Sequence, residues 1–166
     1  FSAFTLAYAA FEVPSGWLGD MIGPRKVITR IVVWWSIFTT LTGAVHHLWT
    51  MITVRFLFGA GEAGTYPNSA KILSRWMPRA ERGFAQGMMW MWGRLGGAFA
   101  PALVGFMLLH MRWRTTFWVF GTVGIVWAIL FWLWFRDTPR ERPNVNEAEL
   151  AIIHAGQAVP GRSSHL

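Results

Sequence analysis

Apolar residues of this chain gather in long blocks, and short turns rich in glycine, proline and charged residues separate the blocks. The blocks cover residues 1–18, 27–46, 49–73, 84–111 and 115–135. An α-helix needs about twenty apolar residues to cross a bilayer core of about 30 Å, and each block has roughly that length. Only 14% of the residues are charged, against roughly 25% in a soluble domain. The sequence therefore predicts an all-α membrane protein with about five transmembrane helices.

Positive charge is concentrated in the turns between the apolar blocks, and the net charge is +7. Alternate turns hold most of the basic residues, namely Arg25, Lys26, Arg75, Arg79, Arg82, Arg136, Arg140 and Arg142. The opposite turns hold Arg112 and Arg114. Because basic loops tend to stay in the cytoplasm, residues 19–26, the Arg75 loop and the C-terminal tail are predicted to lie there. This distribution follows membrane topology and argues against a basic surface that binds nucleic acid.

Two charged side chains interrupt the third block, within the stretch RFLFGAGEAGTYP at residues 55–67. Arg55 and Glu62 are seven positions apart, so a helix places them on nearly the same face, about 10 Å apart along its axis. A charged group in lipid costs about 2.5–3.5 kcal/mol on insertion scales, so such groups usually face a protein interior or a watery cavity. The pair is compatible with a structural ion pair between helices. It agrees better with a polar pathway, in which both side chains line one cavity without direct contact.

Local signals predict two further features. Pro67 is predicted to kink the third block in its later half. Near the C-terminus, Asn144 and Glu147 have the spacing of a capping box, which would begin a short amphipathic helix that ends at Gly156.

The turn after the first block, GWLGDMIGPRK at residues 16–26, has regularly spaced glycines around an acid and two bases. It resembles the signature loop between the second and third helices of the major facilitator superfamily. Glycines at this spacing allow close helix contact and a sharp turn, while the charges act through ion pairs and helix ends. The resemblance implies a conformational gate at the cytoplasmic end of the helices. Its expected members are Gly16, Asp20, Gly23, Arg25 and Lys26, together with Arg75 and Glu12. Glu12 would pair with a cytoplasmic-side arginine or, alternatively, reach the membrane interface.

Further stretches narrow the resemblance to one family. They are RFLFGAGEAGTYP, SRWMPRAERG at residues 74–83, GRLGGAFAP at 93–101 and the tail FRDTPRERPNVNEAEL at 135–150. They are similar to the anion:cation symporter family, whose members move hexuronates, aldonates such as galactonate, aldarates such as glucarate, and phthalate-type aromatic carboxylates, usually with protons. The resemblance implies that residues 1–137 are helices two to six of the N-terminal six-helix bundle. Residues 138–166 would begin the central cytoplasmic linker, and the first helix and C-terminal half of the same transporter would be missing partners.

The resemblance also implies roles for single residues. Arg55 matches an arginine implicated in anion recognition, and its planar guanidinium can hold a carboxylate by two parallel hydrogen bonds. Glu62 matches an acidic residue implicated in proton coupling. Tyr8 would donate a hydrogen bond to substrate or, alternatively, be an interfacial or core tyrosine. Arg94 would supply a second cation or pack against a partner helix. Asn68 would offer hydrogen bonds to the cavity or satisfy carbonyl groups freed by a kink.

These expectations describe a secondary active transporter of organic anions in the bacterial inner membrane, driven by proton symport. The alternatives are a carrier of neutral solutes on the same scaffold and a non-transporting membrane receptor or scaffold. The expected partners are a small organic anion, protons and the lipid bilayer, and this chain alone is expected to be inactive. The sequence contains no cysteine, nucleophile–base pair or metal-ligand spacing, so we expect neither an enzyme nor a bound cofactor or metal.

Overall fold

The structure is a computed structural model that describes residues 2–141 and 145–155. The helices are α1 (Ser2–Ile22), α2 (Pro24–Ala44), α3 (Leu48–Glu62), α4 (Thr65–Trp76), α5 (Arg82–His110), α6 (Trp113–Trp134), the 3₁₀ helix η1 (Pro139–Glu141) and α7 (Glu147–Ala155). No strand occurs among the described residues. The all-α prediction is confirmed.

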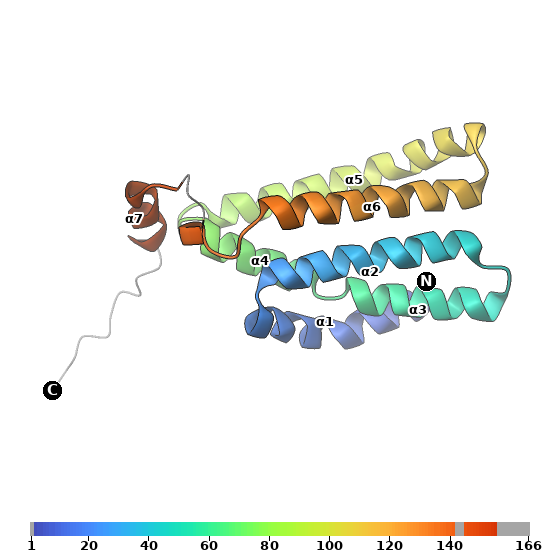
Figure 1. The fold of residues 1–166 in the computed structure, drawn as a ribbon, viewed down its shortest axis with the longest axis horizontal. Helices are drawn as coiled ribbons and strands as arrows, with labels where there is room; N and C mark the ends of the chain where they lie inside the picture. Colours follow the sequence, from blue (N-terminus) through green and yellow to red (C-terminus); the bar gives the residue numbers. More distant parts are fainter. Residues whose placement is uncertain (1, 142–144, 156–166) are drawn as a thin grey trace.

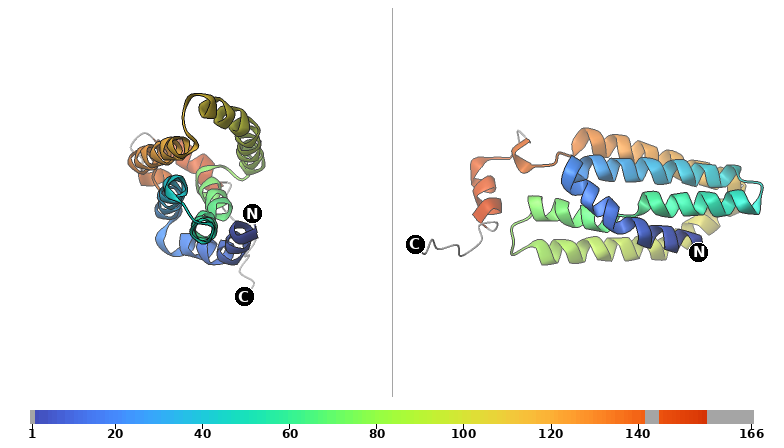
Figure 2. Two further views of the ribbon diagram at one scale, coloured as in Figure 1. Left: turned by 90° about the vertical axis from the view of Figure 1, so that its right-hand side faces the viewer. Right: turned by 90° about the horizontal axis from the view of Figure 1, so that it is seen from below.

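The long helices form an elongated bundle in which neighbours along the chain lie side by side (Figure 1). α2 lies between α6 and α3, and α1 packs on the far side of α3 (Figures 1 and 2). α5 contacts only α4 and α6 closely, and none of its residues is buried. The short connections explain this arrangement, because a turn of a few residues leaves the next helix antiparallel to the last.

Three helices are long and apolar enough to cross a membrane by length and composition, namely α2, α5 and α6. The remaining predicted crossings are α1, which also has 21 residues, and the third apolar block, which forms α3 and α4 end to end (Figure 1). α3 has 15 residues and rises by about 22 Å, so it needs α4 to complete a bilayer core of about 30 Å.

The closest apolar packing lies between α2 and α6. Ile28 and Val32 of α2 are buried against Ala128 of α6, and Val33, Trp35, Ile72 and Phe131 pack around them. Gly121 of α6 brings the two helices together, because an added Cβ there would lie 2.8 Å from the carbonyl oxygen of Ser36. Small residues of α6 therefore allow a tight contact, whereas the glycines of α5 meet no neighbour within 4 Å in the part of the chain that the structure describes.

The third block is interrupted, and it does not have the kink that Pro67 was expected to cause. α3 ends at Glu62 and α4 begins at Thr65, with Gly64 between them at φ 89° and ψ 2°. This left-handed backbone ends a helix and costs a residue other than glycine about 1–2 kcal/mol. The first N–H of α4 that bonds within the helix belongs to Asn68 and donates to Gly64 at 3.1 Å. Pro67 precedes it, so its missing N–H removes no helical bond.

A capping box begins the last helix, two residues later than predicted. The Asn146 side-chain oxygen accepts a hydrogen bond from the Glu149 backbone N–H at 2.8 Å. The Glu149 carboxylate accepts one from the Asn146 backbone N–H at 3.3 Å. The Asn-x-x-Glu spacing occurs twice in this segment, and the described helix begins at Glu147, directly after the second asparagine. Asn144 and the predicted helix end at Gly156 lie outside the described residues.

Replacing Gly64 with alanine should destabilise the full-length protein by about 1–2 kcal/mol through the backbone alone. The loss should be larger, because an added Cβ would overlap the Ser15 side chain. Gly87 of α5 faces open space, so Gly87→Ala should leave the unfolding temperature unchanged or slightly raised. Thermal unfolding in detergent measures both variants. Equal unfolding temperatures for the two would contradict a required break at Gly64.

Candidate functional site

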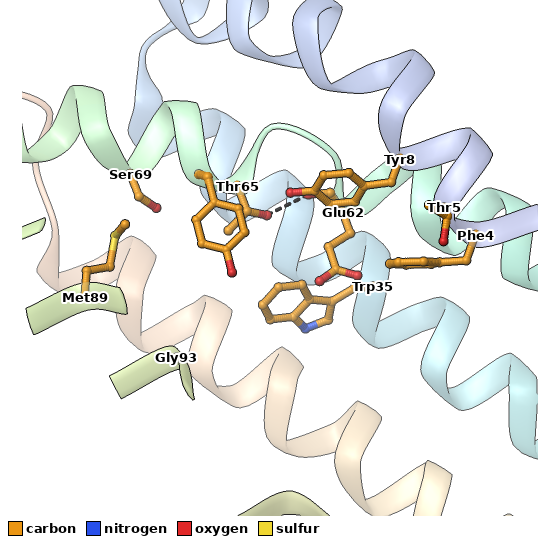
Figure 3. A pocket seen from close by; sticks show the side chains of 10 residues that line it. Phe4, Thr5, Tyr8, Trp35, Glu62, Thr65, Ser69, Met89 and Gly93 are labelled. Carbon is orange, nitrogen blue, oxygen red and sulfur yellow. Dashed lines mark hydrogen bonds between the residues drawn. The ribbon is translucent and has the colours of Figure 1, made fainter. Parts of the chain in front are cut away.

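A cavity of about 620 Å³ lies beside the break between α3 and α4. Its walls are Phe4, Thr5 and Tyr8 of α1, Trp35 of α2, Glu62 of α3, Thr65, Tyr66 and Ser69 of α4, and Met89 and Gly93 of α5. Figure 3 shows the Glu62 carboxylate directed into this space beside Trp35. Tyr66 stacks on Trp90 of α5 with ring centroids 4.4 Å apart, which gives the cavity a flat aromatic border. Glu62 is the charged residue of this lining.

Two polar groups of the Glu62 cavity have no protein partner. The side-chain carboxylate of Glu62 makes no hydrogen bond or ion pair with the residues that the structure describes. The backbone carbonyl of Glu62 accepts a hydrogen bond from the Thr65 hydroxyl at 2.6 Å. The Tyr8 hydroxyl is buried and also has no partner within the described ranges. Buried polar groups without partners are rare because they are costly. The half-buried Glu62 carboxylate is therefore open to a proton, a water molecule or a ligand in the cavity.

Arg55 lies at a second cavity, of about 580 Å³, which is lined by Phe4, Met51, Arg55 and Phe58. Its guanidinium faces the rings of Phe58 and Phe117, 5.9 and 6.0 Å from their centroids. Arginine adopts such positions because a planar cation is attracted to the face of an aromatic ring. The cation therefore sits in an aromatic setting that leaves its hydrogen-bond donors to a ligand.

The expectation that Arg55 and Glu62 share one cavity was wrong. Phe4 lines both cavities and packs against Phe58, with ring centroids 5.8 Å apart. Seven residues of spacing put both charges on one side of α3, but aromatic rings fill the turn between them. The expected lack of direct contact agrees with the structure, since no ion pair joins the two residues within the described part of the chain.

The break also brings the first turn of α4 to the Glu62 cavity. Thr65 and Tyr66 are the first residues of α4, and both line the cavity. The first N–H groups of a helix lack partners within it and carry the positive end of its dipole. In membrane transporters, the N-termini of interrupted helices point at anionic groups of substrates. The cavity thus combines one carboxylate with an electropositive helix end.

The structure places Asn68 and Arg94 away from these cavities. Asn68 is fully buried between α1 and α4, and its amide donates to the carbonyls of Ser15 at 3.1 Å and Gly64 at 2.8 Å. This matches the alternative role of satisfying carbonyl groups at a helix interruption, and the substrate-binding role of Asn68 stays a prediction. Arg94 is exposed on α5, next to Gly93 of the cavity wall, and it lines neither cavity.

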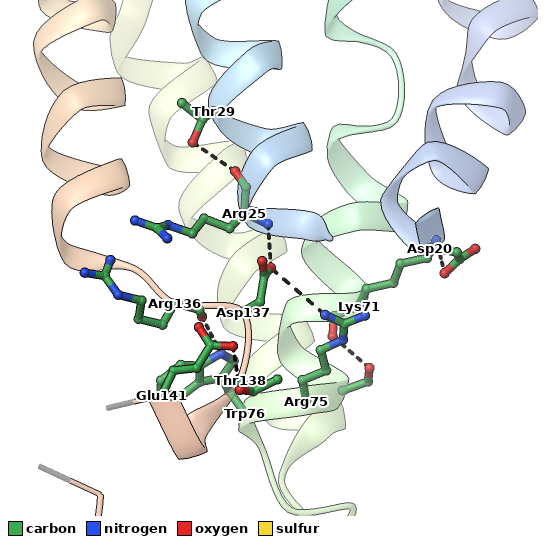
Figure 4. A network of polar contacts seen from close by, with 11 residues as sticks. Asp20, Arg25, Thr29, Lys71, Arg75, Trp76, Arg136, Asp137, Thr138 and Glu141 are labelled. Carbon is green, nitrogen blue, oxygen red and sulfur yellow. Dashed lines mark hydrogen bonds and ion pairs between the residues drawn. The ribbon is translucent and has the colours of Figure 1, made fainter. Parts of the chain in front are cut away.

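The acid of the signature loop is paired with a residue that sequence reasoning missed. Lys71 of α4 forms an ion pair with Asp20 at 2.7 Å and donates to the Gly16 carbonyl at 2.5 Å (Figure 4). These contacts join the end of α1 to α4. Glu12 forms no ion pair with the described residues, so its expected arginine partner is not found. Lys26 is exposed.

Asp137 joins the start of α2 to the end of α6 and to α4. Its carboxylate accepts a hydrogen bond from the Arg25 backbone N–H at 2.8 Å and lies 4.0 Å from Arg75 (Figure 4). Gly23 has φ 89°, and an added Cβ there would lie 2.7 Å from this carboxylate. Gly23 therefore allows both the turn and the close approach of Asp137. The sequence pattern did not identify Asp137.

Sequence reasoning also missed several residues of the Glu62 cavity, among them Phe4, Trp35, Thr65 and Ser69. One available signal was the order Gly64-Thr65-x-Pro67, since glycine before a hydroxyl residue and a nearby proline is typical of a new helix start. Placing the break there would have brought Thr65 beside Glu62. Trp35 carries no such signal, because it reaches the cavity only through the packing of α2.

The family model described as Major Facilitator Superfamily matches residues 1–163. The chain is 39% identical to the "Probable sulfoacetate transporter" of Cupriavidus necator over 92% of this chain and 36% of that protein. It is 34% identical to the "Probable galactarate/D-glucarate transporter" of Bacillus subtilis, over 94% of this chain and 35% of that protein. It is also 34% identical to the "Probable L-galactonate transporter" of Escherichia coli, over 93% of this chain and 34% of that protein.

A solved structure supports the fold. A bacterial homolog of the human lysosomal transporter Spinster, in an inward-facing and occupied conformation, superposes with a TM-score of 0.66 at 23% identity, over 86% of this chain and 36% of that one. The chain thus spans about a third of the length of the curated relatives and of this structure. Its apolar helices and these relatives identify an integral membrane protein. The relatives carry transporter names, in agreement with the expectation that the protein is not an enzyme.

Proposed function

This chain belongs to the Major Facilitator Superfamily, and on that premise we propose that the full-length protein carries organic anions across a membrane together with protons. The supporting observation is the pair of neighbouring cavities, one with the Arg55 cation and one with the unpartnered Glu62 carboxylate. The names of the relatives, which specify sulfoacetate, galactarate or D-glucarate, and L-galactonate, support a substrate that carries at least one acidic group.

Each charged residue has a separate task in this proposal. The substrate carboxylate or sulfonate binds the Arg55 guanidinium, whose donors match two oxygens of a planar or tetrahedral anion. Glu62 takes up a proton in the adjoining cavity, and the Tyr8 hydroxyl donates a hydrogen bond to substrate or to the carboxylate. Phe4 separates the two cavities, so the proton and the anion need not compete for the same space.

Charge balance then couples the two ligands. With both sites loaded, Arg55 is paired and Glu62 is neutral, so the helices can close around the site without an isolated buried charge. With one ligand absent, an unpaired charge would have to be buried, which is strongly unfavourable. Movement of the bundle between outward and inward access would therefore require anion and proton together, as in alternating-access carriers.

The organisation of the longer protein is part of the same proposal. Residues 1–137 would form helices two to six of its N-terminal bundle, and residues 138–166 would begin a cytoplasmic linker. The position of α7 beyond the end of the long helices supports this division (Figure 1). The signature-loop contacts of Asp20 and Arg25 would hold the cytoplasmic end closed or open. The bacterial relatives support residence in a bacterial inner membrane.

Counterflow in proteoliposomes tests the substrate class. Full-length protein preloaded with unlabelled sulfoacetate or D-glucarate should take up the labelled acid at least about tenfold faster than a neutral sugar, because a neutral solute lacks a charge-assisted bond to Arg55. Equal counterflow of the neutral sugar would indicate a neutral-solute carrier on the same scaffold. Binding of the acid without any exchange would indicate a receptor or scaffold.

A further inference from the structure

Two guanidinium groups come together at the cytoplasmic end of α6 without a carboxylate between them. Arg25 and Arg136 both donate to the carbonyl oxygen of Trp132, and Arg25 also lies over the Trp132 ring, 4.0 Å from its centroid. Figure 4 shows both guanidinium groups near the end of α6. Neither side chain forms an ion pair within the described residues. The neighbouring Asp137 is turned to Arg75 and to the α2 backbone.

The carbonyls at the end of α6 account for only part of this arrangement. Arg136 donates through Nη1 to Trp132, Leu133 and Phe135, at 3.3, 3.2 and 2.9 Å. Cations at the C-terminal end of a helix are favourable, but the gain is modest for one group and does not remove the repulsion between two. Each guanidinium has further N–H donors. The site therefore has the charge and the donors to hold an anion.

A small apolar groove lies farther along the contact between α2 and α6. It has a volume of about 220 Å³ and is lined by Ile37, Thr40 and Leu41 of α2 and Gly121, Thr122 and Ile125 of α6. Its hydroxyl groups are already bonded within their own helices, Thr40 to Ser36 at 3.0 Å and Thr122 to Trp118 at 2.9 Å. The groove thus presents mainly hydrocarbon to its surroundings.

Helical periodicity places the groove and the basic pair on similar faces of α2 and α6. Trp132 follows Ile125 by seven positions, so both occupy the same face of α6. Thr40 follows Arg25 by fifteen positions, which is close to four turns, and lies on a similar face of α2. Ser36 is eleven residues beyond Arg25, a rise of about 16 Å, which matches half of a bilayer core of about 30 Å.

We propose that this surface binds one anionic phospholipid, with its phosphate on Arg25 and Arg136 and an acyl chain in the groove between α2 and α6. The two guanidinium groups offer the paired donors that phosphate oxygens accept. The polar end and the apolar groove are separated by the depth of one leaflet. A soluble anion would use the first feature and leave the second without a function.

Native mass spectrometry of the full-length protein in detergent, titrated with phosphatidylglycerol, tests the assignment. Wild type should bind one phosphatidylglycerol more tightly than phosphatidylcholine. Arg25→Gln and Arg136→Gln should each weaken this binding about fivefold, the contribution of one basic residue near an anionic lipid. Arg79→Gln is the matched control, because it removes one exposed charge from the connection between α4 and α5, outside the basic pair and the groove, and should change little.

A variant in the groove separates lipid binding from the capping of α6. Ile125→Trp leaves the basic pair intact and fills the groove, so it should also reduce phosphatidylglycerol binding severalfold. An unchanged affinity for Ile125→Trp, or efficient displacement of the lipid by equimolar inorganic phosphate, would overturn the proposal in favour of a simple anion site. An equal loss with Arg79→Gln and Arg136→Gln would overturn it in favour of general surface charge.

Discussion

Replacing Arg55 with lysine should lower the affinity of the full-length protein for an acidic substrate by about tenfold to a hundredfold. Lysine keeps the positive charge but cannot form two parallel hydrogen bonds with one carboxylate. A charge-assisted hydrogen bond contributes about 1.5–3 kcal/mol, and about 1.4 kcal/mol corresponds to a factor of ten. Lysine also loses the planar contact with the Phe58 and Phe117 rings that orients the guanidinium. Equilibrium binding of a labelled acid to purified protein measures the effect.

Arg112→Lys is the matched control for this change. Arg112 is exposed at the start of α6 and lines neither described cavity, so the same chemical substitution there should leave the affinity unaltered. If Arg55→Lys bound the acid as tightly as wild type, bidentate recognition at Arg55 would be excluded. If both variants lost affinity equally, the loss would not be specific to Arg55 and would come from any arginine-to-lysine change in this protein.

Replacing Glu62 with glutamine should abolish accumulation driven by a pH gradient while leaving exchange of substrate intact. Glutamine has the shape of protonated glutamic acid but can neither bind nor release the proton. One unit of pH difference is worth about 1.4 kcal/mol per proton, so coupling to one proton supports about tenfold accumulation. The variant should therefore equilibrate the acid without concentrating it. Uptake into proteoliposomes with an imposed pH gradient measures accumulation, and counterflow at equal pH measures exchange.

The control for this variant is Glu81→Gln, which neutralises an exposed carboxylate in the α4–α5 connection. It should retain both accumulation and exchange. Full accumulation by Glu62→Gln would show that another group carries the proton. Loss of both accumulation and exchange would point to a role of Glu62 in holding the helices together.

The sequence predicted the long helices well. Apolar blocks of membrane length, short turns and alternate basic loops depend on local composition, and α2, α5 and α6 agree with the predicted blocks within a few residues. Placing Arg55 and Glu62 at cavities also followed from local reasoning, because isolated charges in lipid are too costly. These features can be predicted without knowing which helices pack against each other.

The details that the sequence did not predict depend on contacts between distant segments. The division of the cavity by Phe4 requires the register of α1 against α3, which no short-range pattern specifies. The burial of Asn68 depends likewise on Ser15. The break at Gly64 differs from the predicted kink at Pro67 because the left-handed conformation open to glycine ends α3 before the proline is reached.

Simultaneous measurement of acid uptake and internal pH in proteoliposomes tests the central claim most directly. With full-length protein, no membrane potential and an acidic exterior, the account predicts accumulation of a labelled organic acid accompanied by acidification of the interior beyond the passive leak. A protonophore should collapse both signals together. Accumulation that is unaffected by the protonophore, or acid entry without any change of internal pH, would contradict a carrier that moves anion and proton through the Arg55 and Glu62 cavities.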